Sequence, residues 1–171
     1  MRITGGELKN IRIKVPQGIR PTQDNVRQAI FNILGEKIKG KKFVDLFAGS
    51  GAVGIDALSR GAEKTTFVDN SRKVIKILKE NLETIDYSAK AEIVVKDARN
   101  ILIDDFDILF ADPPYDKGYL IKVLNNYLPA EQTGKSKKCI LILEHSKYEV
   151  IEIGRNYNFG DAVLTFIESG F

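Results

Sequence analysis

From residue 42 onward the chain alternates short apolar runs with amphipathic segments, and this alternation limits the possible folds more than any other feature. The segments between the runs have helical spacing of apolar residues, most clearly 71–85 and 117–128. Near-continuous apolar runs suit strands that are covered on both faces, and strand–helix alternation implies right-handed crossovers. The sequence therefore predicts a doubly wound, mostly parallel α/β sheet, with strands at residues 43–48, 65–69, 91–97, 106–112 and 139–145.

The two ends of the chain depart from this alternation. Residues 1–16 contain two short alternating runs around Gly-Gly and predict a small hairpin. Residues 20–38 have one apolar helical face, with Thr22 as the expected N-cap. Near the other end, strand-like runs flank residues 158–161 without a helix between them, which predicts an antiparallel hairpin and seven strands in all.

Length and composition set the class of protein. A chain of 171 residues predicts one domain over 1–171, with a basic hairpin and helix over 1–40 and a core over 41–171. A single cysteine, the lack of an apolar secretory segment and the lack of a long apolar run favour a cytoplasmic protein without a membrane span.

Charge is unevenly distributed, although the net charge is only +3. Residues 1–42 carry ten Lys or Arg against three Asp or Glu. Such an asymmetry predicts either a polyanionic partner or a lysine-rich solvated surface, and charge alone does not choose between them.

The stretch after the first predicted strand, Gly49-Ser50-Gly51-Ala52-Val53-Gly54, has the G-x-G-x-x-G spacing, and Asp69 follows Gly49 by 20 residues. This pattern is typical of a dinucleotide site. Acids also stand late in or at the end of four successive predicted strands, at Asp45, Asp69, Asp97 and Asp112. Ligands of such sheets bind beyond the carboxyl ends of the strands, so these acids predict a ligand site there. A glycine turn that holds no ligand is the alternative.

Asp45 argues against a pyrophosphate in that site. Two like charges about 5 Å apart, at an effective dielectric constant near 20, repel by roughly 3 kcal/mol. S-adenosylmethionine has an ammonium, a sulfonium and no phosphate, so Asp45 can accept from its ammonium, Asp69 from its ribose, and Asp97 can read adenine. The predicted cofactor is S-adenosylmethionine and no metal is expected; the predicted cofactor residues are Thr22, Asp45, Phe47, Ala48, Gly49, Ser50, Gly51, Asp69, Asn70, Asp97 and Ala98.

The motif Asp112-Pro113-Pro114-Tyr115 follows the fourth predicted strand. Its prolines fix the backbone and remove two N–H donors, so the turn presents acceptors, the Asp112 carboxylate and the Pro113 carbonyl. These acceptors suit an exocyclic amino group, and Tyr115 offers a face on which a base can stack. These four residues are the predicted catalytic residues. The alternative is a Pro-Pro turn with an Asp cap.

Together these motifs resemble the RsmD-type 16S rRNA guanine-N2 methyltransferases. The likeness rests on "RPTQDNVRQAIFNIL", "DLFAGSGAVGIDALSRGA", "TFVDN", "DPPY", "ILEHS" and "NYNFGDAVLTFIE", and it covers almost the whole chain. The resemblance implies a Rossmann-like class I methyltransferase fold and methyl transfer to the 2-amino group of a guanine. It also implies that the RNA lies in the 30S subunit or its assembly intermediate.

The resemblance and the basic N-terminal segment predict substrate contacts, and we expect a monomer. This sequence departs from the family at Gln28, where members usually carry Glu, and in a hairpin that is less rich in Gly and Lys. The predicted substrate residues are Arg2, Lys9, Arg12, Arg20, Arg27 and His145.

Three other functions remain open from the sequence. D-P-P-Y also permits methylation of adenine N6 or of another amine in DNA or RNA, although the chain has no separate recognition domain. A non-catalytic RNA-binding assembly factor could keep the same fold, but the intact D-P-P-Y motif argues against it. A dehydrogenase would use NADH, and Asp45 argues against that cofactor.

Overall fold

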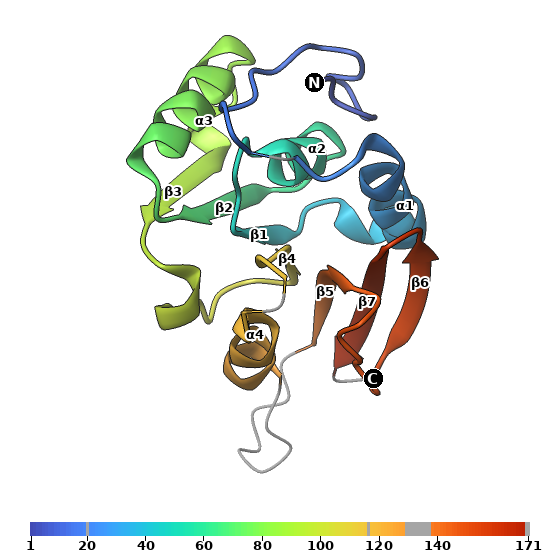
Figure 1. The fold of residues 1–171 in the computed structure, drawn as a ribbon. Helices are drawn as coiled ribbons and strands as arrows, with labels where there is room; N and C mark the ends of the chain where they lie inside the picture. Colours follow the sequence, from blue (N-terminus) through green and yellow to red (C-terminus); the bar gives the residue numbers. More distant parts are fainter. Residues whose placement is uncertain (20, 116, 129–137, 170–171) are drawn as a thin grey trace.

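The structure is a computed structural model that describes residues 1–19, 21–115, 117–128 and 138–169. These described residues form seven strands and four α-helices, which alternate from α1 to β3 (Figure 1). The strands are β1 Lys42–Leu46, β2 Lys64–Asp69, β3 Ala91–Val95, β4 Ile108–Ala111, β5 Cys139–Ser146, β6 Arg155–Phe159 and β7 Ala162–Ser169. The α-helices are α1 Asp24–Leu34, α2 Ala52–Ser59, α3 Arg72–Thr84 and α4 Tyr119–Tyr127, and the short 3₁₀ turns are η1 Gly35–Ile38, η2 Ser88–Lys90 and η3 Ala98–Asn100.

The seven strands form one sheet in the order β3-β2-β1-β4-β5-β7-β6. The first five strands pair in parallel, and β7 lies antiparallel between β5 and β6. This confirms the predicted doubly wound sheet and its C-terminal hairpin. The strand order reverses between β1 and β4, and in open α/β sheets a ligand crevice forms at such a point.

Alternation along the strands sends side chains into two separate cores. Phe43 of β1 packs with Ile55 of α2 and Leu78 of α3, on the face that also carries α1. Its neighbour Val44 packs on the opposite face, with Leu120 of α4. Figure 1 shows α2 and α3 on one side of the sheet and α4 on the other. The same alternation turns Asp45 toward α2.

The N-terminal segment packs on the core as an irregular loop with one antiparallel bridge, between Arg2 and Arg12. Ile3 and Ile13 are buried in the core that faces α1 and α2. The expected hairpin is therefore reduced to that bridge, because its apolar side chains are used in packing against the domain and the chain between them folds as turns.

Helix α1 is shorter than expected and begins without the predicted cap. Gln23 occupies the N-cap position, and the Thr22 hydroxyl instead donates to Asp112 Oδ2 at 3.4 Å. The helix ends at Leu34 because Gly35 takes a φ of 52°, a left-handed conformation that suits glycine, and η1 follows. The strand-like run expected over residues 148–157 forms a strand only from Arg155 onward, and Tyr148 and Val150 are exposed.

No helix in the described part of the chain is long and apolar enough to cross a membrane. Within the same residues, no group of three or more His, Cys, Asp or Glu side chains is arranged to hold a metal ion.

Candidate active site

The loop between β1 and α2 is held in shape by a glycine that cannot be replaced without strain. Gly51 forms the N-cap of α2 with a φ of 79°, and a Cβ there would lie 2.3 Å from Leu78 Cδ1. Gly51 therefore allows the tight strand-to-helix connection, and it does not line the cavity described below. The sequence predicted that Gly51 contacts the cofactor, whereas the structure gives it a role in the packing of this turn.

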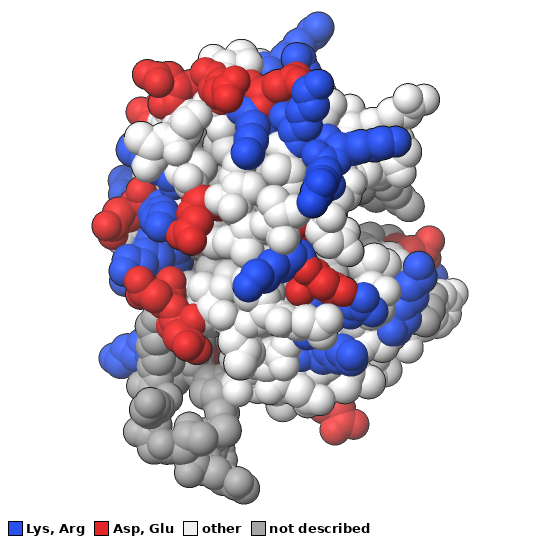
Figure 2. Space-filling view, turned by 90° about the vertical axis from the view of Figure 1, so that its left-hand side faces the viewer, with Lys and Arg blue, Asp and Glu red and all other residues white. Residues whose placement is uncertain are grey.

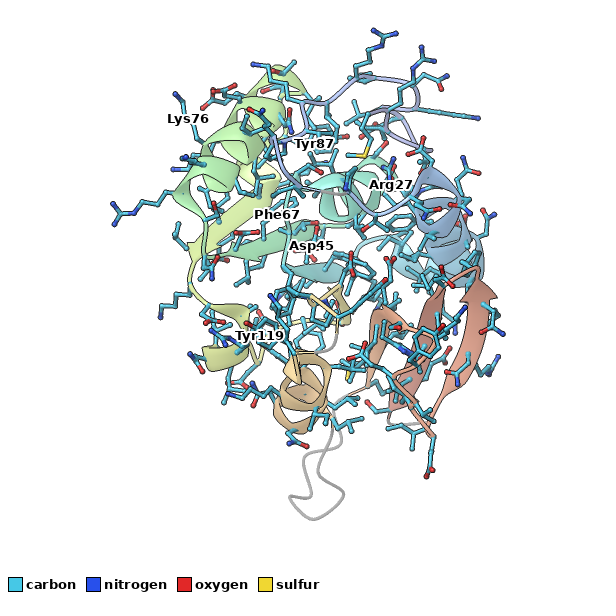
Figure 3. All side chains as sticks on the ribbon, viewed as in Figure 1. Arg27, Asp45, Phe67, Lys76, Tyr87 and Tyr119 are labelled. Atoms are coloured by element: carbon cyan, nitrogen blue, oxygen red, sulfur yellow. The ribbon has the colours of Figure 1, made fainter. Side chains whose placement is uncertain are left out.

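Asp45 is almost fully buried, with 2% of its surface exposed, and lies on β1 beneath α2 (Figure 3). Its Oδ2 accepts a hydrogen bond of 2.9 Å from the backbone N–H of Gly54 in the first turn of α2. Burial raises the pKa of Asp45 well above its usual value, the Gly54 N–H opposes that rise, and nearby Asp112 and Asp69 add to it. A cationic group beside Asp45 would favour its ionised form.

Asp69 ends β2 and ties the glycine loop to the following turn. Its Oδ2 accepts from the Gly49 N–H at 3.0 Å, and its Oδ1 accepts from the Ser71 N–H at 2.8 Å. Each carboxylate oxygen has a second lone pair, so the side chain can accept further hydrogen bonds from a ligand.

Asp97 is tied to Arg99, which sequence reasoning did not single out. Arg99 Nε lies 2.8 Å from Asp97 Oδ1, the Arg99 Nη2 contacts Oδ2, and the Arg99 backbone N–H also donates to Oδ1. The hydrogen bonds from Arg99 lower the pKa of Asp97 to about 2. Asp97 is therefore an ionised acceptor at neutral pH.

Two aromatic rings lie next to the Asp97–Arg99 pair. The Arg99 guanidinium lies 4.6 Å from the centre of the Tyr119 ring, and that ring stacks on Phe47 with centroids 6.3 Å apart and planes 10° apart. Figure 3 shows Tyr119 beside the start of α4. Such flat faces suit an aromatic ligand group such as adenine. The signal in the sequence that could have identified Arg99 as a site residue is its position two residues after Asp97, an acid at a predicted strand end.

A cavity of about 340 Å³ collects nearly all the predicted cofactor residues. Ten of them line it: Thr22, Asp45, Phe47, Ala48, Gly49, Ser50, Asp69, Asn70, Asp97 and Ala98. Residues that the sequence did not assign to this site also line it: Ile19, Pro21, Ala52, Val53, Arg99, Phe110, Pro114 and Tyr119, and Asp112 joins them.

A second cavity, of about 670 Å³, adjoins the first. All four predicted catalytic residues line it, and Asp112 and Pro114 line both cavities. Tyr115 is 37% exposed at this site. Thr22, a predicted cofactor residue, also lines it, and the sequence assigned no role to the remaining lining residues, which are Pro21, Gln23, Asn25, Glu144, Phe159, Gly160, Asp161 and Ala162. They come from the start of α1 and the residues before it, from β5 and from the β6–β7 turn; they lie in stretches that carry the family resemblance, but no chemical pattern in the sequence assigns them to this cavity.

Two predicted substrate residues lie inside the protein and do not reach a surface. Arg27 is fully buried between α1 and α2 (Figure 3), where Nη1 lies 2.5 Å from Asp56 Oδ2. His145 belongs to β5, is 2% exposed, and its Nε2 lies 2.8 Å from Thr165 Oγ1. Both positions correct the expectation of direct RNA contact, because these side chains already bind polar groups within the fold.

The other predicted substrate residues lie in the N-terminal part. Arg2, Lys9 and Arg12 are exposed, whereas Arg20 lies outside the described residues. Several other cations of residues 1–42 form ion pairs with acids, as in Lys14–Glu80 and Lys42–Asp105. On the face that carries α3 and β3, basic and acidic side chains are interspersed (Figure 2).

The sheet order and this site define the Rossmann-like class I methyltransferase fold. The solved structure of yhhF from Escherichia coli is 30% identical, with 99% of this chain and 97% of that chain covered and a TM-score of 0.83. An RNA methyltransferase from Salinibacter ruber, solved in complex with S-adenosyl-L-homocysteine, has the same fold with 12% identity and a TM-score of 0.70, covering 87% and 93% of the two chains.

The chain belongs to the family described as Conserved hypothetical protein 95, whose model matches residues 1–164. A relative from Buchnera aphidicola, named Ribosomal RNA small subunit methyltransferase D, is 31% identical over 95% of this chain and 87% of its own length. These matches confirm the family resemblance that the motifs predicted.

Proposed function

We propose that this chain transfers a methyl group from S-adenosylmethionine to the 2-amino group of a guanine in small-subunit ribosomal RNA. One observation carries the proposal: Asp112 lines both the cavity that contains the predicted cofactor residues and the adjoining cavity of the D-P-P-Y motif. A base in the second cavity would therefore meet a methyl donor in the first at Asp112. The name of the Buchnera relative supports the ribosomal RNA substrate.

The residues of the first cavity fit S-adenosylmethionine. A buried carboxyl at Asp45 suits its ammonium, Asp69 offers lone pairs to ribose hydroxyls, and the Phe47–Tyr119 stack suits adenine. A cavity of this size lies within the usual range for small-ligand sites. When bound there, S-adenosylmethionine supplies an electrophilic methyl group.

The D-P-P-Y motif would orient the amine. Asp112 and the Pro113 carbonyl accept its two N–H bonds, which turns the nitrogen lone pair toward the methyl carbon. Tyr115 stacks on the base, and Asp112 or water takes the proton that the nitrogen loses. Catalysis then depends on positioning and electrostatics, without a covalent intermediate.

RNA would reach this site with its target base flipped out of the stack. The exposed Arg2, Lys9 and Arg12 suit phosphate contacts. We expect the protein to act as a monomer, on the 30S subunit or an assembly intermediate, because so modest a basic surface leaves part of the recognition to the particle.

The test is transfer of tritium from labelled S-adenosylmethionine to unmodified 30S particles, naked 16S RNA and duplex DNA, with nucleoside analysis of the product. We expect N2-methylguanosine, with 30S particles as the best substrate. N6-methyladenine, or no labelled product on any RNA, would refute the proposal.

A variant links this activity to the motif. We expect Asp112→Ala to lose at least about 100-fold in kcat, because it removes an acceptor needed for the transition-state geometry. The dissociation constant for S-adenosylmethionine should stay within a few-fold of wild type, since Asp112 is not its main ligand. Wild-type turnover in this variant would show that the active site lies elsewhere.

A further inference from the structure

The second cavity is lined by acidic side chains. Asp112, Glu144 and Asp161 all line it, and none of its lining residues in the described part of the chain is Lys or Arg. Asp161 is engaged with Lys147 at the surface, with Oδ1 and Nζ 2.5 Å apart. Because phosphate groups are bound by cations, this cavity suits an uncharged base that offers hydrogen-bond donors.

The register of the sheet places two of these carboxylates side by side. Ala111, the last residue of β4, pairs with Leu143 of β5 in parallel, so the next residues are Asp112, directly after β4, and Glu144 of β5. Neighbouring strands lie roughly 4.8 Å apart. Phe110 and Ile142 pack in the same core, and alternation therefore turns Asp112 and Glu144 toward that same face.

Glu144 is positioned to contact a base bound in the second cavity, because it is shielded from bulk water. Only 6% of its surface is exposed, yet it lines the second cavity. It does not line the first cavity, so it is separate from the predicted cofactor contacts. An ionised carboxylate is an acceptor only, which restricts the base edge that it can face.

Guanine and adenine differ in the hydrogen-bonding groups that they would present to the Asp112 and Glu144 carboxylates. On guanine, the N1–H donor lies next to the 2-amino group, so adjacent carboxylates can each accept a hydrogen bond. On adenine, the 6-amino group lies next to N1, which carries a lone pair. With the amino group at Asp112, a carboxylate at Glu144 would then face another acceptor and repel it.

We propose that Glu144 selects guanine by accepting a hydrogen bond from its N1–H, while Asp112 and the Pro113 carbonyl hold the 2-amino group. This proposal rests on the function proposed above and adds a specificity-determining residue to it. Glu144 comes from β5, outside the D-P-P-Y motif, and reaches the same cavity through the strand register.

The test compares two bases at one position. Once the methylated guanine is mapped, 30S particles are reconstituted with RNA carrying either guanine or 2-aminopurine there. 2-Aminopurine keeps the 2-amino group but has a lone pair at N1 in place of N1–H. For Glu144→Gln, we expect kcat/KM on guanine to fall about 10- to 100-fold, as for the loss of a charge-assisted hydrogen bond.

The preference for guanine over 2-aminopurine should fall by at least about tenfold in Glu144→Gln, because the Gln amide can donate to N1. Contacts that O6 makes with residues other than residue 144 are the same in both enzymes and cancel when their preferences are compared. That preference is a ratio within one preparation, so it does not depend on how much of the variant is folded.

The matched control is Glu152→Gln, which removes an exposed carboxylate outside the cavity and should keep the wild-type preference. Suppose that the wild-type enzyme produces N2-methylguanosine and that Glu144→Gln keeps the wild-type preference for guanine over 2-aminopurine. That result would overturn the role of Glu144 and leave the proposed function standing. N6-methyladenine as the wild-type product would instead overturn the proposed function, and the role of Glu144 with it.

Discussion

At the scale of single residues, Asp45 combines a cost to folding with a proposed role in cofactor binding. Burial raises its pKa, so the folded protein holds a proton more tightly than the unfolded chain. The free energy of unfolding therefore falls as pH rises from the unfolded pKa through the raised folded pKa. We expect Asp45→Asn without cofactor to be at least as stable as wild type at neutral pH. Chemical denaturation across this pH range checks the sign.

The same substitution should weaken cofactor binding. Asn can still accept from the Gly54 N–H, but it lacks the charge that attracts an ammonium. We expect the dissociation constant for S-adenosylmethionine, measured by calorimetry, to rise about 10- to 100-fold. Wild-type affinity should also fall as pH drops below the raised pKa of Asp45, and that dependence should disappear in Asp45→Asn. Unchanged affinity in the variant would remove Asp45 from the ammonium site.

At the scale of elements, the buried Arg27–Asp56 pair joins α1 to α2 and to the N-terminal segment. Asp56 also accepts from the Thr4 N–H at 2.7 Å, and Arg27 Nη2 donates to the Arg2 carbonyl at 2.8 Å. We expect Arg27→Met to lose about 3–5 kcal/mol of unfolding free energy in urea, because Asp56 keeps a buried charge without its partner. Lys37→Met, which breaks the exposed pair with Glu168, should cost less than about 1 kcal/mol. Equal losses of unfolding free energy in the two variants would contradict this prediction.

The elements also show where sequence reasoning succeeded. The sheet could be predicted from the alternation of apolar runs and helical segments, and most of the predicted cofactor residues line one cavity because strand-end acids and the glycine loop meet at one edge of the sheet. Glu144 could not, since only the pairing of β4 with β5 brings it beside Asp112. Arg27 was misassigned although it shares the apolar face of α1, three residues before Ile30 and seven before Leu34, and that spacing indicated burial.

At the scale of the whole molecule, positive charge alone does not define the RNA surface. The face with α3 mixes charges of both signs (Figure 2), whereas Arg2, Lys9 and Arg12 are exposed on the segment that packs over α2. A contact between a cation and an RNA phosphate releases counterions, so affinity falls with salt. We expect each Ala substitution at these three positions to weaken 30S binding and to reduce the slope of log K against log salt by about 1.

Lys76 provides the comparison, because it is equally charged and exposed but points outward from the mixed face of α3 (Figure 3). Filter binding across a salt series should give Lys76→Ala the wild-type slope. If Lys76→Ala reduced the slope as much as Arg12→Ala, the RNA would run over α3 as well as over the N-terminal segment, and the N-terminal segment would not be the specific RNA surface. A wild-type slope near zero would mean that phosphate contacts contribute little, and that the protein recognises its particle mainly through the flipped base and the shape around it.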